Sequence, residues 1–283
     1  MNIPTASSTS AFIKTSVSVN GVSVPLNRCS DAILRFCRPA MFHSENKTFD
    51  IGPSGSTLFL RYRGRNFGIC TQHQFGTGDT RLAAEAFTLV VDGADGAKVG
   101  LSPNVATSIA FANEVHRNLA DFYLAEFDDV RGDHRLRPHF LELDLRQTPG
   151  TVAPERIKLI FAVGFPTKHM DIDFAEDHEQ IPTSVNMTLR RFKLYLEMAD
   201  RVAIDMGNRR PLVLHREHGE SLGDPDGLSG APVFFVHVDA SSQAHLDFAG
   251  MITDAVFDHR FMLYEADTIR LLLDRYIDGD PAV

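Results

Sequence analysis

The chain has few of the residues that mark several large protein classes. Its 283 residues include no tryptophan and only three cysteines, and 28 Lys and Arg are outnumbered by 37 Asp and Glu. The net charge of -9 argues against nucleic acid as a partner, because a phosphate backbone is held by clustered cations. Three scattered cysteines do not form a disulfide framework for so long a chain. We therefore expect Cys29, Cys37 and Cys70 to be free thiols in a reducing compartment.

Long apolar runs are also missing. No stretch approaches the roughly 20 apolar residues that span a membrane. The first residues lack the basic leader and the apolar segment of a secretory signal. These absences predict a cytoplasmic protein with no membrane partner. The rest of the composition, with 43% hydrophobic and 23% charged residues, is that of a globular protein with one large domain or two packed lobes.

Short strand-like runs separated by turn residues dominate the sequence. Residues 57–63 and 66–71 flank a turn at Gly64 and predict a β-hairpin. Further strands are predicted at 87–91, 122–127, 158–163, 212–215, 232–238, 248–253 and 261–264. A series of short strands of this kind favours an all-β barrel or sandwich.

Helix is the minority in this pattern. Apolar residues recur at helical spacing from Ile269 to Tyr276 and predict a helix over about 266–278. Residues 1–50 begin with a polar, Ser/Thr-rich stretch and predict an N-terminal extension, either docked or mobile. The Pro and Gly residues of 147–154 continue neither a helix nor a strand, so they predict a linker between two halves.

Three polar segments carry the candidate chemistry. Ser229 lies between Gly227 and Gly230, where a tight turn would expose its hydroxyl beside backbone N–H groups. His73 follows one strand-like run and Asp121 precedes another. A serine hydroxyl is a weak nucleophile without a base in hydrogen-bond reach, so a histidine is chemically required. Each segment also has a plainer interpretation: an ordinary β-turn, an unpartnered histidine and a solvated aspartate.

In their chain order, these segments resemble the trypsin-like serine peptidases of the chymotrypsin fold. The motifs are Cys-Thr-Gln-His at 70–73, Asp-Phe-Tyr-Leu at 121–124, Val-Gly-Phe-Pro at 163–166, Gly-Leu-Ser-Gly-Ala-Pro at 227–232 and Phe-Ala-Gly-Met-Ile at 248–252. The order His, Asp, Ser separates this family from the subtilisins and the α/β-hydrolases.

The resemblance implies a mostly β protein with two antiparallel six-stranded β-barrel lobes. Lobe one would cover about 51–147 and lobe two about 155–265, followed by the C-terminal helix at about 266–278. The peptidase domain would then be 51–283, with residues 1–50 as the extension. The active cleft would lie between the lobes.

The resemblance also implies the roles of the polar residues. Ser229 would attack a peptide carbonyl, His73 would take its proton and pass it to the leaving amine, and Asp121 would hold the imidazole. The backbone N–H groups of Gly227 and Ser229 would form the oxyanion hole.

In this family, two further segments line the pocket that determines substrate preference. They correspond here to Asp224, before the nucleophile, and to Thr253, Asp254 and Ala255. A carboxylate at the pocket floor would favour cleavage after Arg or Lys through a charge-assisted hydrogen bond. Acidic loop residues that face water are an equal alternative.

Two departures from the common family pattern bear on activation and on activity. Leu228 precedes the nucleophile where digestive and clotting relatives have Asp, and no Ile-Val-Gly-Gly-like segment follows a basic cleavage site. Activation by a newly cut N-terminus is therefore not supported, and the pattern is closest to bacterial intracellular members. Thr71 lies one position nearer to His73 than the threonine of the family's common motif does. This difference indicates either simple variation or a displaced histidine in a domain that has lost its activity.

The function implied is that of a cytoplasmic serine endopeptidase. It would hydrolyse peptide bonds of a restricted protein target through a Ser-His-Asp triad and an acyl-enzyme, without a cofactor. Its setting suggests a bacterial defence or signalling module, in which it activates a partner effector or is itself activated by a protein partner. The alternative is a catalytically silent protease-like interaction domain.

Two clusters resemble metal sites only in part. His215 and His218 have the spacing of zinc ligands, but no third and fourth ligands accompany them. The acidic residues of 171–179 lack the alternation and the glycine of a calcium loop. We expect no metal, and we expect 168–186 to be a solvated surface loop.

Overall fold

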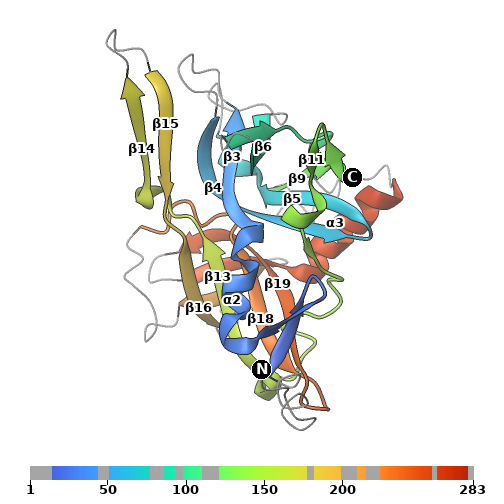
Figure 1. The fold of residues 1–283 in the computed structure, drawn as a ribbon. Helices are drawn as coiled ribbons and strands as arrows, with labels where there is room; N and C mark the ends of the chain where they lie inside the picture. Colours follow the sequence, from blue (N-terminus) through green and yellow to red (C-terminus); the bar gives the residue numbers. More distant parts are fainter. Residues whose placement is uncertain are drawn as a thin grey trace, which may run out of the picture.

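The structure is a computed structural model, and the description covers nine segments of the chain. These are residues 15–43, 51–76, 86–93, 98–109, 121–176, 182–198, 209–214, 224–256 and 260–279. The protein is mostly β, with two curled sheets and one long C-terminal helix (Figure 1). The mostly-β class predicted from the sequence is confirmed. No helix in these segments is both long and apolar enough to cross a lipid bilayer.

The first lobe is an eight-stranded sheet. Its strands are β3 (Cys37–His43), β4 (Ile51–Tyr62), β5 (Arg65–Thr71), β6 (Phe87–Asp92), β7 (Lys98–Leu101), β8 (Val105–Ile109), β9 (Phe122–Phe127) and β12 (Leu141–Glu142). Their order is β7-β6-β3-β4-β5-β9-β8, and β12 pairs in parallel with β4. Within the described residues β7 and β8 remain at opposite edges and do not pair. The prediction of two closed six-stranded barrels is therefore wrong for this lobe.

The second lobe has six strands. They are β13 (Ile157–Gly164), β16 (Phe192–Met198), β17 (Arg209–Leu214), β18 (Pro232–Val238), β19 (Ala244–Val256) and β20 (Arg260–Glu265). Antiparallel pairing runs in the order β13-β16-β17-β20-β19-β18 and returns from β18 to β13. The shift of register in the β18 and β19 pair falls between Val233 and Phe234. This irregularity lies just beyond the turn that carries Ser229.

Residues before 50 belong in part to the body of the protein. The hairpin of β1 (Ser16–Val19) and β2 (Val22–Pro25) leads through η1 (Leu26–Arg28), α2 (Cys29–Ile33) and η2 (Leu34–Phe36) into β3. Ile33 and Phe36 are fully buried, and β3 is an internal strand of the first sheet. The boundary predicted at residue 50 therefore does not separate an extension from lobe one, because the sheet needs β3 between β4 and β6.

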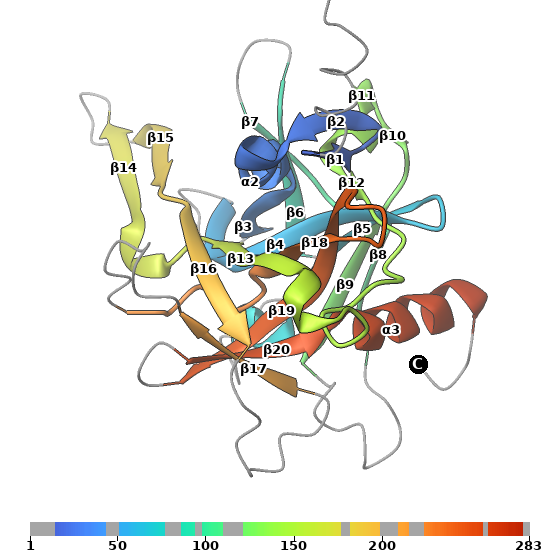
Figure 2. The same ribbon diagram turned by 90° about the horizontal axis from the view of Figure 1, so that it is seen from below.

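The predicted acidic surface loop at 168–186 contains a β-hairpin. After η9 (Thr167–His169), β14 (Met170–Glu176) pairs with β15 (Pro182–Leu189) from Met170 opposite Leu189 onward. The hairpin stands away from the body in both views (Figures 1 and 2). The remaining short elements are η3 (Gln72–Phe75), β10 (Val130–Arg131), β11 (His134–Arg135), η7 (Arg137–His139) and η8 (Pro154–Arg156).

The predicted C-terminal helix is confirmed as α3 (Ala266–Asp278). Its apolar stripe, which includes Ile269, Leu272 and Leu273, is buried. The helix lies beside β19 and β20 (Figure 2). The same apolar cluster contains Ile69 of the first lobe and Phe161 of the second. Separate apolar clusters fill the interior of each lobe. The helix thus helps to join two lobes that each have their own core.

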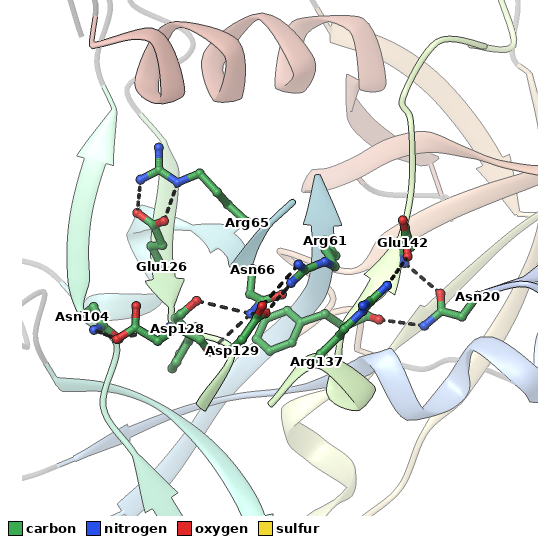
Figure 3. Close-up of polar contacts among 12 residues, drawn as sticks. Asn20, Arg61, Arg65, Asn66, Asn104, Glu126, Asp128, Asp129, Arg137 and Glu142 are labelled. Carbon is green, nitrogen blue, oxygen red and sulfur yellow. Dashed lines mark hydrogen bonds and ion pairs between the residues drawn. The ribbon is translucent and has the colours of Figure 1, made fainter. Parts of the chain in front are cut away.

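A polar network links residues of β4, β5 and β9 and of the segment after β9 in the first lobe (Figure 3). Arg61 pairs with Asp129 and also donates to Asn66. Arg65 makes a bidentate pair with Glu126 at 2.5 Å for each contact. These contacts fix the start of β5 and the end of β9 relative to each other. The opposite ends of the same two strands carry the candidate site.

Candidate functional site

Strand pairing brings His73 and Asp121 together. In the β5 and β9 register Thr71 lies opposite Phe122, so η3 begins where Asp121 precedes β9. The Gln72 N–H donates to the Asp121 carbonyl at 2.8 Å, which continues the ladder by one residue. The two candidate residues therefore meet because of the sheet register, although 48 positions separate them.

The Asp121 carboxylate holds both the ring and the backbone of His73. The Nδ1 atom lies 2.8 Å from Oδ2 and 3.0 Å from Oδ1 of Asp121. The His73 backbone N–H also donates to Oδ1 at 2.9 Å. With Nδ1 directed at the carboxylate, Nε2 is the ring nitrogen available to accept a proton.

The surroundings of His73 favour its protonated form. The hydrogen bond with Asp121 raises the pKa of His73 above its ordinary value, and the charges of Asp121, Asp254 and Asp226 act in the same direction. Burial opposes them, but the side chain keeps 44% of its surface exposed. Asp226 and Asp254 belong to the second lobe, so the imidazole faces the junction between the lobes.

The turn that carries Ser229 has an alternating hydrogen-bond pattern. Leu228 N–H donates to Pro225 O at 3.1 Å, and Gly230 N–H donates to Ile252 O at 2.8 Å. The N–H groups of Gly227 and Ser229, which alternate with these two along the chain, have no acceptor within the described segments. Two neighbouring unpaired N–H groups on a glycine-flanked turn form a site that can accept a developing negative charge.

Two contacts fix the direction of those two N–H groups. The Asp226 carbonyl accepts from Thr167 N–H at 2.9 Å, and the Leu228 carbonyl accepts from Ala231 N–H at 2.9 Å. In a planar trans peptide the N–H points opposite to the C=O. The N–H groups of Gly227 and Ser229 therefore point away from the body of the turn. Gly227 has φ +89°, which only glycine adopts readily.

The Ser229 hydroxyl is directed at β19. Its Oγ donates to the Thr253 carbonyl at 3.3 Å. The Nε2 atom of His73 lies 3.5 Å from Thr71 Oγ1. No hydrogen bond joins Ser229 and His73 in this conformation of the described residues. Such contacts are often long or absent without substrate and form in the reacting complex.

Ser56 is a site residue that sequence analysis missed. Its hydroxyl donates to Gly227 O at 2.8 Å and accepts from Phe165 N–H at 2.9 Å, and its own N–H donates to Ser229 O at 3.0 Å. One residue of β4 thus contacts the turn from the first lobe. No motif could have revealed this contact, because Ser56 lies 171 positions from Gly227.

The predicted specificity residues surround the same turn. Asp224, Asp254 and Ala255 are exposed, while Thr253 is buried with its Oγ1 donating to Met262 O at 3.3 Å. Asp224 Oδ1 accepts the Asp226 N–H at 3.1 Å. The carboxylates therefore lie on the surface beside the site and not at the floor of a buried pocket.

The described residues do not cover the two partial metal motifs in full. No group of three or more His, Cys, Asp or Glu side chains in the described segments could hold a metal ion. His215 and His218 lie outside the described residues. All three cysteines are free and buried, and burial raises the pKa of the Cys70 thiol, the nearest to His73 in sequence.

The sequence matches no protein-family model, and no curated protein matches it.

Replacement of Asp121 by Asn is expected to lower the pKa of His73. The variant loses the carboxylate bond that raises this pKa, while the opposing effect of burial remains. An NMR titration of the imidazole, assigned with His73→Gln, measures the change. In the wild type the midpoint should exceed the ordinary value of about 6.5.

The same shift has a consequence for stability. Because the folded-state pKa is raised, His73 stabilises the fold fully below its unfolded pKa, and this contribution disappears as pH rises through the folded pKa. Asp121→Asn should flatten that part of the curve of stability against pH. If the NMR titration midpoint of His73 is the same in Asp121→Asn as in the wild type, the assigned role of the carboxylate is contradicted.

Proposed function

We propose that this protein is a serine endopeptidase of the trypsin-like kind, with Ser229 as nucleophile, His73 as general base and Asp121 as its partner. The observation that carries the proposal is the meeting of two half-sites from different lobes. The first lobe supplies a His–Asp pair with contacts of 2.8 and 3.0 Å. The second supplies a serine on a turn whose N–H groups at 227 and 229 are unpaired within the described residues.

The reaction begins with a rotation of the serine side chain. Ser229 Oγ leaves the Thr253 carbonyl and donates to His73 Nε2, which removes the hydroxyl proton as Oγ attacks the peptide carbonyl. The carbonyl oxygen becomes negative and receives hydrogen bonds from the N–H groups of Gly227 and Ser229. His73 then gives its proton to the leaving amine. In the second half of the reaction, His73 removes a proton from water as the water attacks the acyl-enzyme. His73 then gives that proton to Ser229 Oγ, which leaves as the free hydroxyl.

The turn is held in this form without a new N-terminus. Leu228 is fully buried and belongs to the apolar core of the second lobe. Gly164 leaves room for it, since a Cβ there would lie 2.5 Å from Leu228 Cδ2. An apolar anchor thus takes the place of the Asp found in relatives activated by cleavage. This supports a peptidase whose oxyanion hole is formed without proteolytic activation.

The proposed substrate is a protein segment with a basic residue beside the cleaved bond. Asp226 and Asp254 are close enough to favour the charged form of His73, and both are exposed. Their position at the surface gives a weak, screened attraction for Lys or Arg. The proposal extends to a restricted target in the cytoplasm, such as a partner effector.

A fluorophosphonate probe tests the reaction itself. The wild type should form a covalent adduct at Ser229, since the probe reacts only with a serine activated by a base. Ser229→Ala and His73→Ala should lose labelling, whereas Ser241→Ala, at an exposed serine outside the site, should keep it. Mass spectrometry locates the adduct. An unlabelled wild type, with a control protease labelled in parallel, would favour the silent interaction domain.

Gly227→Ala tests the oxyanion hole. A Cβ at this position would lie 2.6 Å from Thr167 N and 2.7 Å from Phe165 O, so the turn must shift. The expected loss in kcat is about 100- to 1000-fold, the usual effect of removing one such donor. Gly132→Ala is the control, because Gly132 also has positive φ but has nothing within 4 Å of its added Cβ. Equal activity of both variants would contradict the assignment.

A peptide panel tests the substrate class. Peptides with Lys or Arg before the cleaved bond should react faster than those with Leu or Ala. Asp254→Asn should reduce this preference by about two- to fivefold, since an exposed ion pair contributes at most about 1 kcal/mol. Asp133→Asn, in the exposed turn between β10 and β11, should leave it unchanged. Preference for apolar residues would refute the basic specificity.

A further inference from the structure

The side chain of Gln74 crosses from the first lobe to the nucleophile turn. Gln74 directly follows His73 in η3, and only 7% of it is exposed. Its Nε2 donates to Ser56 O at 3.1 Å and makes a second, shorter contact with Ser229 O. A residue adjacent to the candidate base thus binds the backbone carbonyl of the candidate nucleophile.

Two glycines provide the space for this side chain. A Cβ on Gly55 would lie 2.9 Å from Gln74 Cδ, and a Cβ on Gly230 would lie 2.5 Å from Gln74 Nε2. Both glycines have positive φ, at +82° and +80°. A Cβ on Gly55 would displace the amide. A Cβ on Gly230 would also lie 2.0 Å from Ser56 O, so this glycine leaves room for the backbone of β4 as well as for Gln74.

The amide completes the restraint on the Ser229 peptide. The Ser229 carbonyl accepts from Gln74 and from Ser56 N–H, while the N–H of the following Gly230 donates to Ile252 of β19. Because the peptide is planar, these bonds fix it from opposite sides. The Ser54 hydroxyl in turn donates to the Gln74 carbonyl at 2.8 Å. Because this peptide is attached to the Ser229 Cα, it fixes the position from which the serine side chain extends.

The Gln74 amide carries an energetic cost that good packing would not require. Its Oε1 is buried and has no hydrogen-bond partner in the described part of the chain. An unpaired buried acceptor is destabilising, so an apolar side chain of the same shape would serve packing better. What glutamine provides, and an apolar residue does not, is the pair of N–H donors directed at the two carbonyls.

We propose that Gln74 is a positioning residue of the peptidase, fixing the nucleophile turn of the second lobe relative to the His73 segment of the first. The inference rests on the proposed function. Gln74 does not contact the reacting atoms, so its effect is on their geometry. A misplacement of about 1 Å can reduce a rate about 100-fold, which sets the scale of the expected effect.

The test replaces Gln74 by Met, which keeps the length and packing but has no N–H donors. Fluorophosphonate labelling and kcat should fall about 10- to 100-fold, with KM within about twofold. The midpoint of the rate against pH should not move, because the His73 and Asp121 pair is intact. Hydrogen exchange at the Ser56 amide should become faster, because its acceptor on Ser229 is less restrained.

Gln243→Met is the matched control. Gln243 Nε2 also bridges two carbonyls, those of Ser16 and Ala244, at 3.2 Å each, but at the junction of β1 and β19. Its replacement removes the same kind of donor from a different junction. Labelling and kcat should stay at the wild-type level.

The outcomes separate this inference from the proposed function. If the wild type is labelled at Ser229 and Gln74→Met reacts at the same rate, the positioning role is overturned and the peptidase proposal stands. If the wild type is not labelled, both proposals are overturned. Faster hydrogen exchange at the Ser56 amide in Gln74→Met would then show only that Gln74 has a structural role. If Gln74→Met does not fold, Gln74→Glu, which matches the shape and cannot donate when ionised, should show the same loss. A wild-type rate in that variant also overturns the proposal.

Discussion

The geometry of the site depends on how the carbonyl groups of one turn are bound. Thr167 holds the carbonyl of Asp226, Ala231 holds that of Leu228, and Ser56 and Gln74 hold that of Ser229. Because each peptide is planar, every bound carbonyl determines where the next N–H points. Two N–H groups are thereby directed outward with no acceptor in the described residues. The proposed nucleophile and the two outward N–H groups are therefore placed by the same constraint.

The two lobes contribute different kinds of rigidity to this constraint. In the first lobe, the ladder between β5 and β9 places His73 beside Asp121, and the ion pair between Arg65 and Glu126 secures the same two strands. In the second lobe, the buried Leu228 anchors the turn in an apolar core. The apolar cluster shared by both lobes and helix α3 keeps the halves together. The proposed catalytic groups lie on two separately cored units and require such a junction, since small displacements between them change the rate.

The negative charges near His73 lie at the protein surface. The acidic residues near His73 lie on the exposed side of the second lobe, where water screens them. They favour the charged imidazole, which develops during the proposed reaction, and they attract a basic substrate only weakly. Selectivity for a restricted target would then need contacts beyond the residue that enters the site.

The sequence by itself determined the mostly-β class, the C-terminal helix and the motif order that led to His73, Asp121 and Ser229. These features depend on local periodicity and on short spacings, which a linear sequence preserves. It did not reveal that β3 belongs to the first sheet or that β7 and β8 stay unpaired in the described residues, because these pairings involve strands far apart in the chain. The pairing of β14 with β15 was missed as well. Ser56 and Gln74 were also missed, since their contacts with the nucleophile turn join residues 171 and 155 positions apart. Only the tertiary structure brings such pairs together, because their hydrogen bonds follow from the packing of one lobe on the other and have no local signature.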